Sequence, residues 1–358
     1  MKLFQQLLVA PAALGLLAPL SVSASEVNFD DISTYSNDNL EIDLNSFNQK
    51  STNNLLAGGE GLVESSDPIG GFSETTTASF GVDFVVGAED GAASEAAQFS
   101  YQMGIGLSTS FTGEDSLYVT IDIGDGTSGA LAFDDTDDAL TVDGLTYTFP
   151  VGGATVMVGD STDISAVYTG ACAYSSFTDY MGNCGTGSTV GVGGNGVTAA
   201  MSYAFDSGFS LAGGVSSETG SILTEEGTDI YGIEAAYSAD SWGVSVAYSD
   251  NEAATAWGVN GTYAFDAVTL SAGVESVDSG TTAEGFFVGL SFPEVGPGSF
   301  DLGMGTTGNF ADGDTEYYTY EASYAYPVND GVTITPGVYI VEGTTDVTGV
   351  AVKTSFSF

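Results

Sequence analysis

The sequence predicts an all-β protein, a transmembrane antiparallel β-barrel of about 16 strands. Three observations support this fold class: segment after segment alternates between apolar and small or polar residues, the number of segments is even, and every second connection is short. A period of two indicates a strand, because successive side chains point to opposite sides of the pleat. In a membrane barrel one side meets lipid and the other encloses water, so this alternation recurs around the ring.

The last expected strand shows the pattern most clearly. Phe356 and Phe358 share one face with apolar residues, whereas Lys353 lies on the opposite face among small residues. A terminal phenylalanine with an aromatic residue two positions earlier is typical of bacterial outer-membrane proteins. In chain order, the strands before it are expected at 80–86, 99–107, 117–123, 145–149, 154–159, 201–205, 209–211, 231–237, 242–248, 257–265, 268–274, 286–292, 300–304, 318–326 and 332–340.

The connections between these segments indicate the topology. Those after even-numbered strands are short, and those after odd-numbered strands tend to be longer, acidic and rich in Gly and Thr. Short periplasmic turns alternating with longer outside loops are how bacterial barrels are built. Counts of fourteen or eighteen strands are the alternatives, because the patterns at 145–149, 154–159 and 300–304 are the weakest. A soluble β-sandwich or propeller is the other alternative, but it would not show this alternation of connection lengths.

Two segments precede the expected barrel, which covers 73–358. Residues 1–24 have the features of a secretory signal peptide: a Met-Lys start, an apolar stretch, and the small residues Val22-Ser23-Ala24 as a cleavage site. Residues 25–72 are acidic and polar without sustained alternation, and we expect them to form a short periplasmic extension.

Composition excludes several classes of function. The chain has a net charge of −45, no Arg and no His, and its only cations are Lys2, Lys50 and Lys353. Nucleic acid is excluded as a partner because no basic surface could neutralise phosphates. An enzyme is not expected, because without His neither a Ser-His-Asp triad nor a His-based metal centre can form. The 43% of hydrophobic residues excludes a disordered chain.

The residues on the non-lipid face suggest a water-filled conduit. Barrels of about sixteen strands are wide enough to leave an aqueous channel, and acidic rings in a pore favour cations. For some of these carboxylates the alternative is a solvated position near a strand end. The pore-lining candidates are Asp83, Asp122, Glu234, Glu275, Asp301 and Glu321, opposed only by Lys353.

The longest outside connection, 160–195, is the candidate for a constriction loop. It contains Asp160, Asp163 and Asp179, together with both cysteines, and no arginine exists to oppose the carboxylates. Two cysteines in an exported protein favour a disulfide, so we expect a Cys172–Cys184 bridge rather than two free thiols. The alternative to an inward-folded loop is an external flap stapled by the same bridge.

No cofactor or structural metal is expected. Two acidic runs, 134–138 and 312–316, have oxygen ligands of the kind that Ca²⁺ takes. Neither run has an EF-hand spacing, so a weakly bound Ca²⁺ is the most that these connections suggest, and a solvated loop is the simpler interpretation.

The sequence also resembles a known family. The start MKLFQQLLVAPAALGLLAPLSVSA, the segment LTYTFPVGGATVMVG at 145–159 and the Phe-terminated barrel resemble the outer-membrane porins of cyanobacteria, distant relatives of carbohydrate-selective porins. The resemblance implies an outer-membrane location, passive diffusion of small solutes or inorganic ions, and a homotrimer. Members of that family typically carry an S-layer-homology domain and a coiled coil before the barrel, and residues 25–72 are too few for both.

The functional hypothesis is therefore an outer-membrane porin for small hydrophilic solutes and ions, with a preference for cations. One alternative is a structural or receptor-like barrel whose acidic loops shape the cell surface. Another is a substrate-specific carbohydrate channel, which would need aromatic stacking residues in the lumen, and only Tyr118 and Tyr339 are candidates.

Overall fold

The computed structural model describes residues 76–92, 95–126, 129–131, 133, 135–190, 196–224 and 227–358. The chain divides into two compact units, Met1–Glu60 and Gly61–Phe358, and the structure below belongs to the second. The expected signal peptide at 1–24 and extension at 25–72 lie outside the described residues.

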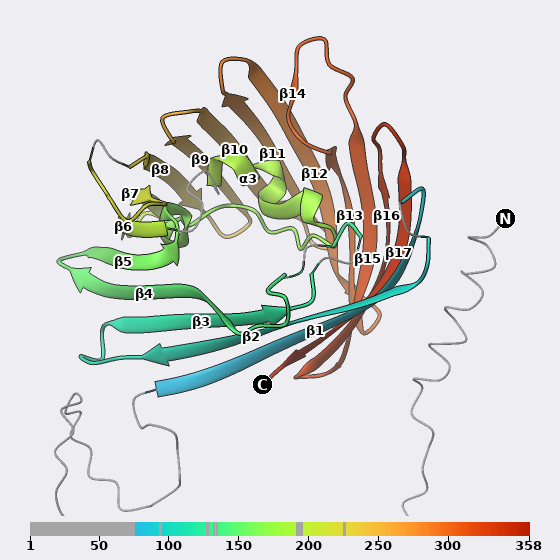
Figure 1. Cartoon of the computed structure of the whole chain (residues 1–358), viewed down its shortest axis with the longest axis horizontal. Coiled ribbons are helices and arrows are strands. Elements are labelled where there is room, and N and C mark those ends of the chain that lie inside the picture. The colour runs from blue at the N-terminus through green and yellow to red at the C-terminus, as the bar shows by residue number, and fades with distance from the viewer. Residues whose placement is uncertain are drawn as a thin grey trace, which may run out of the picture. The chain divides into compact units, whose positions relative to one another are not determined.

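The described part of the chain forms one closed antiparallel barrel of sixteen strands, because β1 pairs with β17 and each other strand pairs with its neighbours (Figure 1). A seventeenth strand, β14 (Phe310–Ala311), is two residues long and pairs with the start of β12, at Ala283 and Glu284. The prediction of sixteen strands is therefore confirmed. The sixteen are β1 (Thr76–Asp90), β2 (Gln98–Thr109), β3 (Ser116–Gly124), β4 (Thr141–Val151), β5 (Ala154–Thr162), β6 (Gly196–Ala204), β7 (Phe209–Ser217), β8 (Asp229–Ser238), β9 (Trp242–Asp250), β10 (Thr255–Ala264), β11 (Thr269–Asp278), β12 (Thr282–Val295), β13 (Gly298–Thr306), β15 (Tyr318–Asn329), β16 (Val332–Val341) and β17 (Val347–Ser357).

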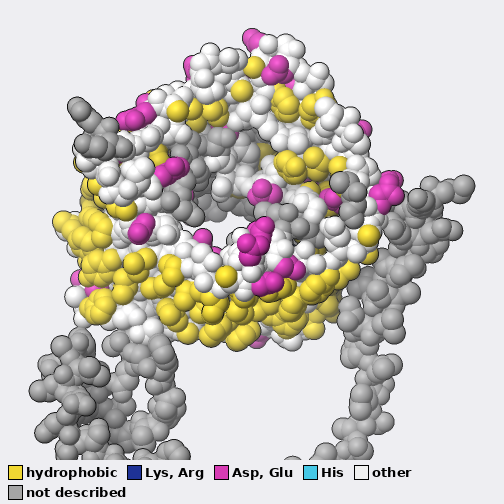
Figure 2. Space-filling model, in the orientation of Figure 1, with side chains coloured by type: hydrophobic (Ala, Val, Ile, Leu, Met, Phe, Trp, Pro, Cys, Tyr) yellow, Lys and Arg dark blue, Asp and Glu magenta, His cyan; other side chains and the backbone are white. Residues whose placement is uncertain are grey.

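The register places the apolar side chains on the outer face. Residues directly opposite each other share a face, and Phe84 lies opposite Tyr101 on β2 and Thr354 on β17. A broad band of hydrophobic side chains covers the outside of the barrel (Figure 2). The closing strands are also joined by aromatic contacts, since the ring of Phe358 stacks on Phe80 with 5.4 Å between their centroids.

Connections at the two ends of the barrel differ in length, as expected. At one end, called the short-turn end here, each connection has six residues or fewer, for example the one between Ala204 and Phe209. At the opposite end, four connections are long and lie before β4, β6, β8 and β15. The connections after β9, β11 and β16 are as short as those at the other end, so the greater length at this end is a tendency, as the sequence indicated. The one after β9 is closed by Asn251, whose Oδ1 accepts the N–H groups of Ala253 and Ala254.

The buried apolar side chains lie inside the barrel rather than between two sheets. They form three clusters, and each forms where an inward-folded connection packs against the inner wall. No helix in the described residues is long and apolar enough to cross a membrane. The α3 helix (Gly187–Val190) lies within the ring of strands in Figure 1.

Candidate channel and inner loop

The connection between β5 and β6 folds into the barrel, and its described residues, 163–190, are called the inner loop here. It contains two short 3-10 helices, η4 (Ile164–Val167) and η5 (Asp179–Gly185), followed by α3. Asp163 caps η4, because its Oδ1 accepts the N–H of Ser165 at 2.6 Å. The three short helices lie against β6–β13, so the loop covers one side of the barrel interior. The inward path is the one expected of a constriction loop.

The first anchor of the inner loop is Glu234 on β8. One of its carboxylate oxygens accepts the N–H of Thr169 at 2.7 Å, and the other accepts the N–H of Gly170 at 2.8 Å. The side chain is only 3% exposed. A buried carboxylate is costly unless it is hydrogen-bonded, and bonds from N–H groups to a charged acceptor are among the stronger ones. The two loop N–H groups therefore offset the cost of burying the Glu234 carboxylate, and the carboxylate in turn fixes this part of the loop backbone.

A second anchor, Asn260 on β10, connects the two arms of the inner loop. Its Oδ1 accepts the N–H of Ala171 at 3.0 Å, and its Nδ2 donates to the hydroxyl of Thr186 at 3.1 Å. Ser245 on the neighbouring strand also donates to Oδ1, at 2.9 Å. The Asn260 side chain thus binds the loop both before and after its Cys172–Cys184 segment.

Glu275 on β11 holds the end of the loop. Its Oε2 accepts the N–H of Thr189 at 2.6 Å and the hydroxyl of the same residue at 2.8 Å. The other oxygen accepts from Asn309 Nδ2 at 2.8 Å, in the connection that precedes β15. The carboxylate therefore joins two connections to one strand.

Glu321 on β15 holds the tip of the loop and makes the most bonds. Its Oε1 accepts the hydroxyl of Tyr174 and the N–H of Phe177, both at 2.8 Å. Its Oε2 accepts the N–H of Thr178 at 2.8 Å and the hydroxyl of that residue at 2.5 Å. Burial, and then the neighbouring Glu321 charge, raises the pKa of Tyr174, so this hydroxyl stays a donor.

The predicted disulfide lies within this tip. Cys172 and Cys184 are bonded, with 5.7 Å between their Cα atoms, and the ring that they close contains all the residues that bind Glu321. Glycines on the inner wall of the barrel leave space for this disulfide-closed segment. A Cβ on Gly337 would lie 2.4 Å from the ring of Phe177, and one on Gly273 would lie 1.9 Å from the carbonyl oxygen of Cys184.

A second inward contact was not foreseen from the sequence. The connection between β3 and β4 reaches the tip of the inner loop, where Ala130 accepts the N–H of Asp179 at 3.0 Å. The N–H of Ala130 is in turn bound by Glu89 on β1 at 3.1 Å. Leu131 and Phe133 pack with Phe177 against the wall. Their apolar character inside an otherwise acidic connection was the signal available in the sequence.

Three of the predicted pore-lining carboxylates are thus covered. Glu234, Glu275 and Glu321 lie on the inner face, but they are buried beneath the inner loop and do not face open water. Asp301 on β13 is also buried, and the hydroxyl of Ser291 donates to it at 2.5 Å.

The remaining predicted residues lie away from these anchors. Asp83 is half-buried on the inner face of β1 and accepts a hydrogen bond from Gln102 at 2.9 Å. Asp122 lies on the inner face of β3, close to Gly104. Lys353 is half-buried on the inner face of β17, opposite Val85 and Thr335.

Two of the three predicted loop carboxylates belong to the inner loop. Asp163 caps η4, and Asp179 is exposed at the start of η5. Asp160 does not belong to it, which corrects the prediction. The β5 strand continues to Thr162, and the register places Asp160 opposite Leu145 on the outer face.

The open part of the lumen lies between the inner loop and the wall formed by β1–β4. A central opening with acidic side chains around it is visible in Figure 2. Asp83, Tyr118 and Asp122 are on this wall, and the ring of Tyr118 is 39% exposed. A Cβ on Gly81 would meet no atom within 4 Å, in contrast to the glycines under the loop.

The described residues contain no group of three or more His, Cys, Asp or Glu side chains arranged to hold a metal ion. The weak Ca²⁺ binding suggested for the acidic runs at 134–138 and 312–316 stays a prediction. Within the first run, Asp138 accepts the hydroxyl of Tyr101 at 2.7 Å.

The fold of the barrel is shared by solved structures of bacterial proteins. In solved structures, the barrel is similar to OprB of Pseudomonas putida (TM-score 0.64, 13% identity, 79% of this chain and 94% of that chain). It is also similar to two engineered mutants of the Rh. blastica porin (TM-score 0.55 for both, 17% and 18% identity, 79% of this chain and 100% of those chains). No curated protein sequence matches the chain.

The family model described as Gram-negative porin matches residues 77–346. This match spans the barrel from its first strand to the connection before its last strand, including the inner loop and its anchors. The chain therefore belongs to the Gram-negative porins, the outer-membrane channels through which solutes diffuse.

Proposed function

We propose that this porin is a constricted diffusion channel for small hydrophilic solutes and ions, with a preference for cations. The observation that carries the proposal is the sign of the charges around the opening. The wall opposite the inner loop has Asp83 and Asp122, the loop contributes Asp179, and Lys353 is the one cationic side chain of the described barrel. A lumen lined by one sign of charge concentrates ions of the opposite sign.

The inner loop sets the width of the passage in this proposal. It occupies the side of the lumen along β6–β13, and its hydrogen bonds to buried carboxylates hold it there. The Cys172–Cys184 bridge restricts the conformations that the tip can adopt. General diffusion is favoured because the family is that of diffusion channels and the inner loop leaves an opening along β1–β4.

Ion selectivity in a planar bilayer tests the proposal. Reversal potentials across a potassium chloride gradient are expected to favour potassium over chloride for the wild-type protein. The double variant Asp83→Asn/Asp122→Asn should reduce this preference, whereas Asp240→Asn, in an exposed turn at the short-turn end, should not. A wild-type reversal potential that favours chloride would overturn the selectivity claim.

A carbohydrate channel is the second candidate, since one lumenal aromatic favours it. Tyr118 is exposed in the opening, where a sugar ring could stack on it. Tyr339 is unsuitable because it is 3% exposed and its hydroxyl donates to Glu89. Block of ion current by maltose that disappears in Tyr118→Ala would favour this candidate over general diffusion.

One recording of channel current distinguishes a purely structural or receptor-like barrel from both channel candidates. Steps of open current from purified, inserted protein support a channel, and silence supports the structural role. We also propose a homotrimer in an outer membrane of the cyanobacterial type, which rests on the sequence resemblance. Chemical crosslinking in native membranes that gives only monomers would argue against the trimer.

A further inference from the structure

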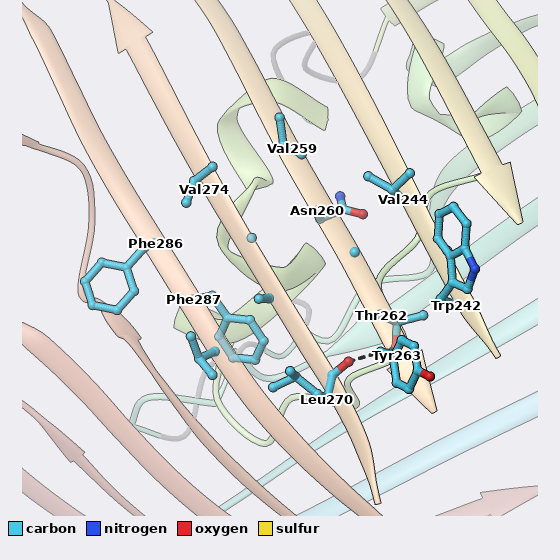
Figure 3. Close-up of a pocket in the computed structure, with 15 residues that line it drawn as sticks. Trp242, Val244, Val259, Asn260, Thr262, Tyr263, Leu270, Val274, Phe286 and Phe287 are labelled. Atoms are coloured by element: carbon cyan, nitrogen blue, oxygen red, sulfur yellow. Dashed lines mark hydrogen bonds between the residues drawn. The ribbon is translucent and has the colours of Figure 1, made fainter. Parts of the chain in front are cut away.

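A polar chamber lies behind the inner loop, between the loop segments 165–172 and 183–186 and the inner face of β8–β10. Its volume is about 310 Å³, enough for several water molecules at about 30 Å³ each. In Figure 3 the helices of the inner loop are visible behind β10, where Asn260 binds Thr186. The polar side chains that line the chamber include Tyr168 and Thr186 from the loop and Glu234, Ser245 and Asn260 from the wall.

Glu234 is the loop anchor that lines the chamber, and it accepts fewer hydrogen bonds than the other two glutamates. Each of its oxygens accepts one loop N–H, whereas Glu321 accepts two bonds on each oxygen and Glu275 accepts three in all. An ionised carboxylate has about four lone-pair sites. No other donor among the described residues binds Glu234, so about two of these sites remain open to the chamber.

Two hydroxyl groups without partners lie at the end of the chamber nearer the long connections. Ser249 follows Ala247 on the inner face of β9, is 3% exposed, and has no hydrogen-bond partner for its Oγ within the described residues. The Tyr168 hydroxyl also lacks a partner in this part of the chain. Both lie at Gly232, which is directly opposite Ser249 and whose added Cβ would lie 2.4 Å from the Tyr168 hydroxyl. A buried hydroxyl without a partner is costly, so the pair indicates a ligand that binds both.

The charge around the chamber indicates the sign of that ligand. Burial, followed by the charges of Glu234 and Asp163, raises the pKa of the Tyr168 hydroxyl, so both carboxylates act on this end of the chamber. No Lys or Arg occurs in the described residues of the inner loop or of β6–β12. A buried charge is costly unless it is paired, and the attraction between opposite charges is strong where water is scarce. The ligand is therefore a cation.

The oxygen atoms that line the chamber favour a monovalent ion. They belong to hydroxyl groups, an amide and a single carboxylate, since Glu234 is the one acidic side chain among the described lining residues. Hard cations take oxygen ligands, and protein sites for Ca²⁺ usually combine several carboxylates. One carboxylate balances the charge of one monovalent ion, and the remaining volume holds part of its hydration shell.

We propose that this chamber binds one monovalent cation, an alkali ion or ammonium, together with some of its water. The ion bridges the Glu234 carboxylate and the hydroxyl groups of Tyr168 and Ser249, and it thereby joins the first arm of the inner loop to β8 and β9. The site lies behind the loop. It does not depend on the selectivity of the passage, which is proposed for Asp83 and Asp122 on the opposite wall.

Anomalous diffraction locates the ion directly. Crystals of the full chain are grown with the bulky cation N-methylglucamine in place of alkali ions. They are then soaked in a low concentration of thallium(I) acetate, whose Tl⁺ ion replaces K⁺. An anomalous peak is expected in the chamber, next to Glu234 and the hydroxyl groups of Tyr168 and Ser249. Peaks confined to the open passage, or water alone in the chamber, would overturn the site.

Thermal unfolding in a non-ionic detergent, followed by intrinsic fluorescence, tests the site in solution. The unfolding temperature of the wild-type protein should rise in potassium, sodium or ammonium chloride relative to N-methylglucamine chloride at the same ionic strength, because a ligand of the folded state stabilises it. Tyr168→Phe/Ser249→Ala should lose this shift, although the loop bonds to Glu234 remain. Tyr180→Phe/Ser202→Ala makes the same chemical changes on the loop and the inner wall outside the chamber, and it should keep the shift.

Three results in solution would refute the proposal. The first is one unfolding temperature for the wild-type protein in all four salts. The second is a full shift that persists in Tyr168→Phe/Ser249→Ala, which would place the ion elsewhere. The third is a larger shift with calcium chloride that this variant abolishes, which would assign the chamber to a divalent ion. If the variant does not fold, the thallium map of the wild-type protein still decides the question.

Discussion

Glu321 anchors the tip of the inner loop, and the variant Glu321→Gln tests how much this anchor stabilises the position of the tip. The carboxylate accepts four hydrogen bonds from three residues of the tip, two on each oxygen. In glutamine one oxygen becomes an NH₂ group, which cannot accept, so two of the four bonds are lost. Bonds to a charged acceptor contribute about 1.5–3 kcal/mol each, which gives about 3–6 kcal/mol of lost anchoring free energy.

This loss is large compared with the 1.4 kcal/mol that changes a population tenfold. The ends of the loop remain held by Glu234 and Glu275, so only residues 173–183 are expected to detach. Amide hydrogen exchange at Phe177 and Thr178 should therefore accelerate by at least about tenfold. Single-channel current should show additional fluctuation, because the tip moves in and out of the passage.

Asp179→Asn is the matched control, since it removes one negative charge from the same tip. Asp179 contacts the neighbouring connection through its backbone N–H, not its side chain. The control should lower cation preference without accelerating exchange or adding current noise. If Glu321→Gln exchanges at the wild-type rate and gives quiet current, the carboxylate is not an anchor and the reasoning fails.

Three further predictions concern the loop and the barrel. Reduction of the Cys172–Cys184 bridge should lower the temperature of the heat-induced gel shift, since a ring of this size contributes about 3 kcal/mol; equal shifts with and without reductant would contradict this. Gly337→Ala should displace Phe177 and raise conductance, because the added Cβ would lie 2.4 Å from its ring, whereas Gly81→Ala, with no atom within 4 Å, should leave conductance unchanged. The N–H of Thr112, followed by nearby hydroxyls, holds the pKa of Asp115 well below its usual range against the effect of burial. A depressed folded-state pKa stabilises the barrel above the unfolded pKa, and this contribution is lost as pH falls through the folded value. Thermal unfolding of Asp115→Asn should therefore occur at lower temperature at pH 7 and depend less on acid than the wild type; identical pH profiles would refute it.

The barrel itself could be predicted because the alternation of apolar and polar residues is a local pattern within each strand. Alternation along 80–86 or 350–358 requires only that each strand face lipid on one side, and the register between β1 and β17 follows the same pattern. The disulfide followed from export and from the presence of two cysteines. Asp160 was misplaced because strand ends have no sharp signal in the sequence, and β5 continues through Thr162.

The role of the lumenal carboxylates could not be read from the sequence, since an inward-facing acid looks the same whether water or a loop covers it. The glycines show the same ambiguity. Gly81 and Gly337 are both inner-face glycines, yet one borders open space and the other accommodates Phe177. The fold of a long connection depends on contacts between residues more than 140 positions apart, such as Phe177 with Glu321.

This distinction changes which experiment can measure selectivity. Neutralising Glu234, Glu275 and Glu321 together would remove three charges and also release the inner loop, because each accepts bonds from the loop backbone. A fall in cation preference in that variant would not separate the lost field from a widened passage. Asp83 and Asp122 lie on the opposite wall, away from the loop anchors. Their neutralisation changes the field and leaves the constriction in place, so a change in reversal potential at constant conductance would isolate the electrostatic contribution.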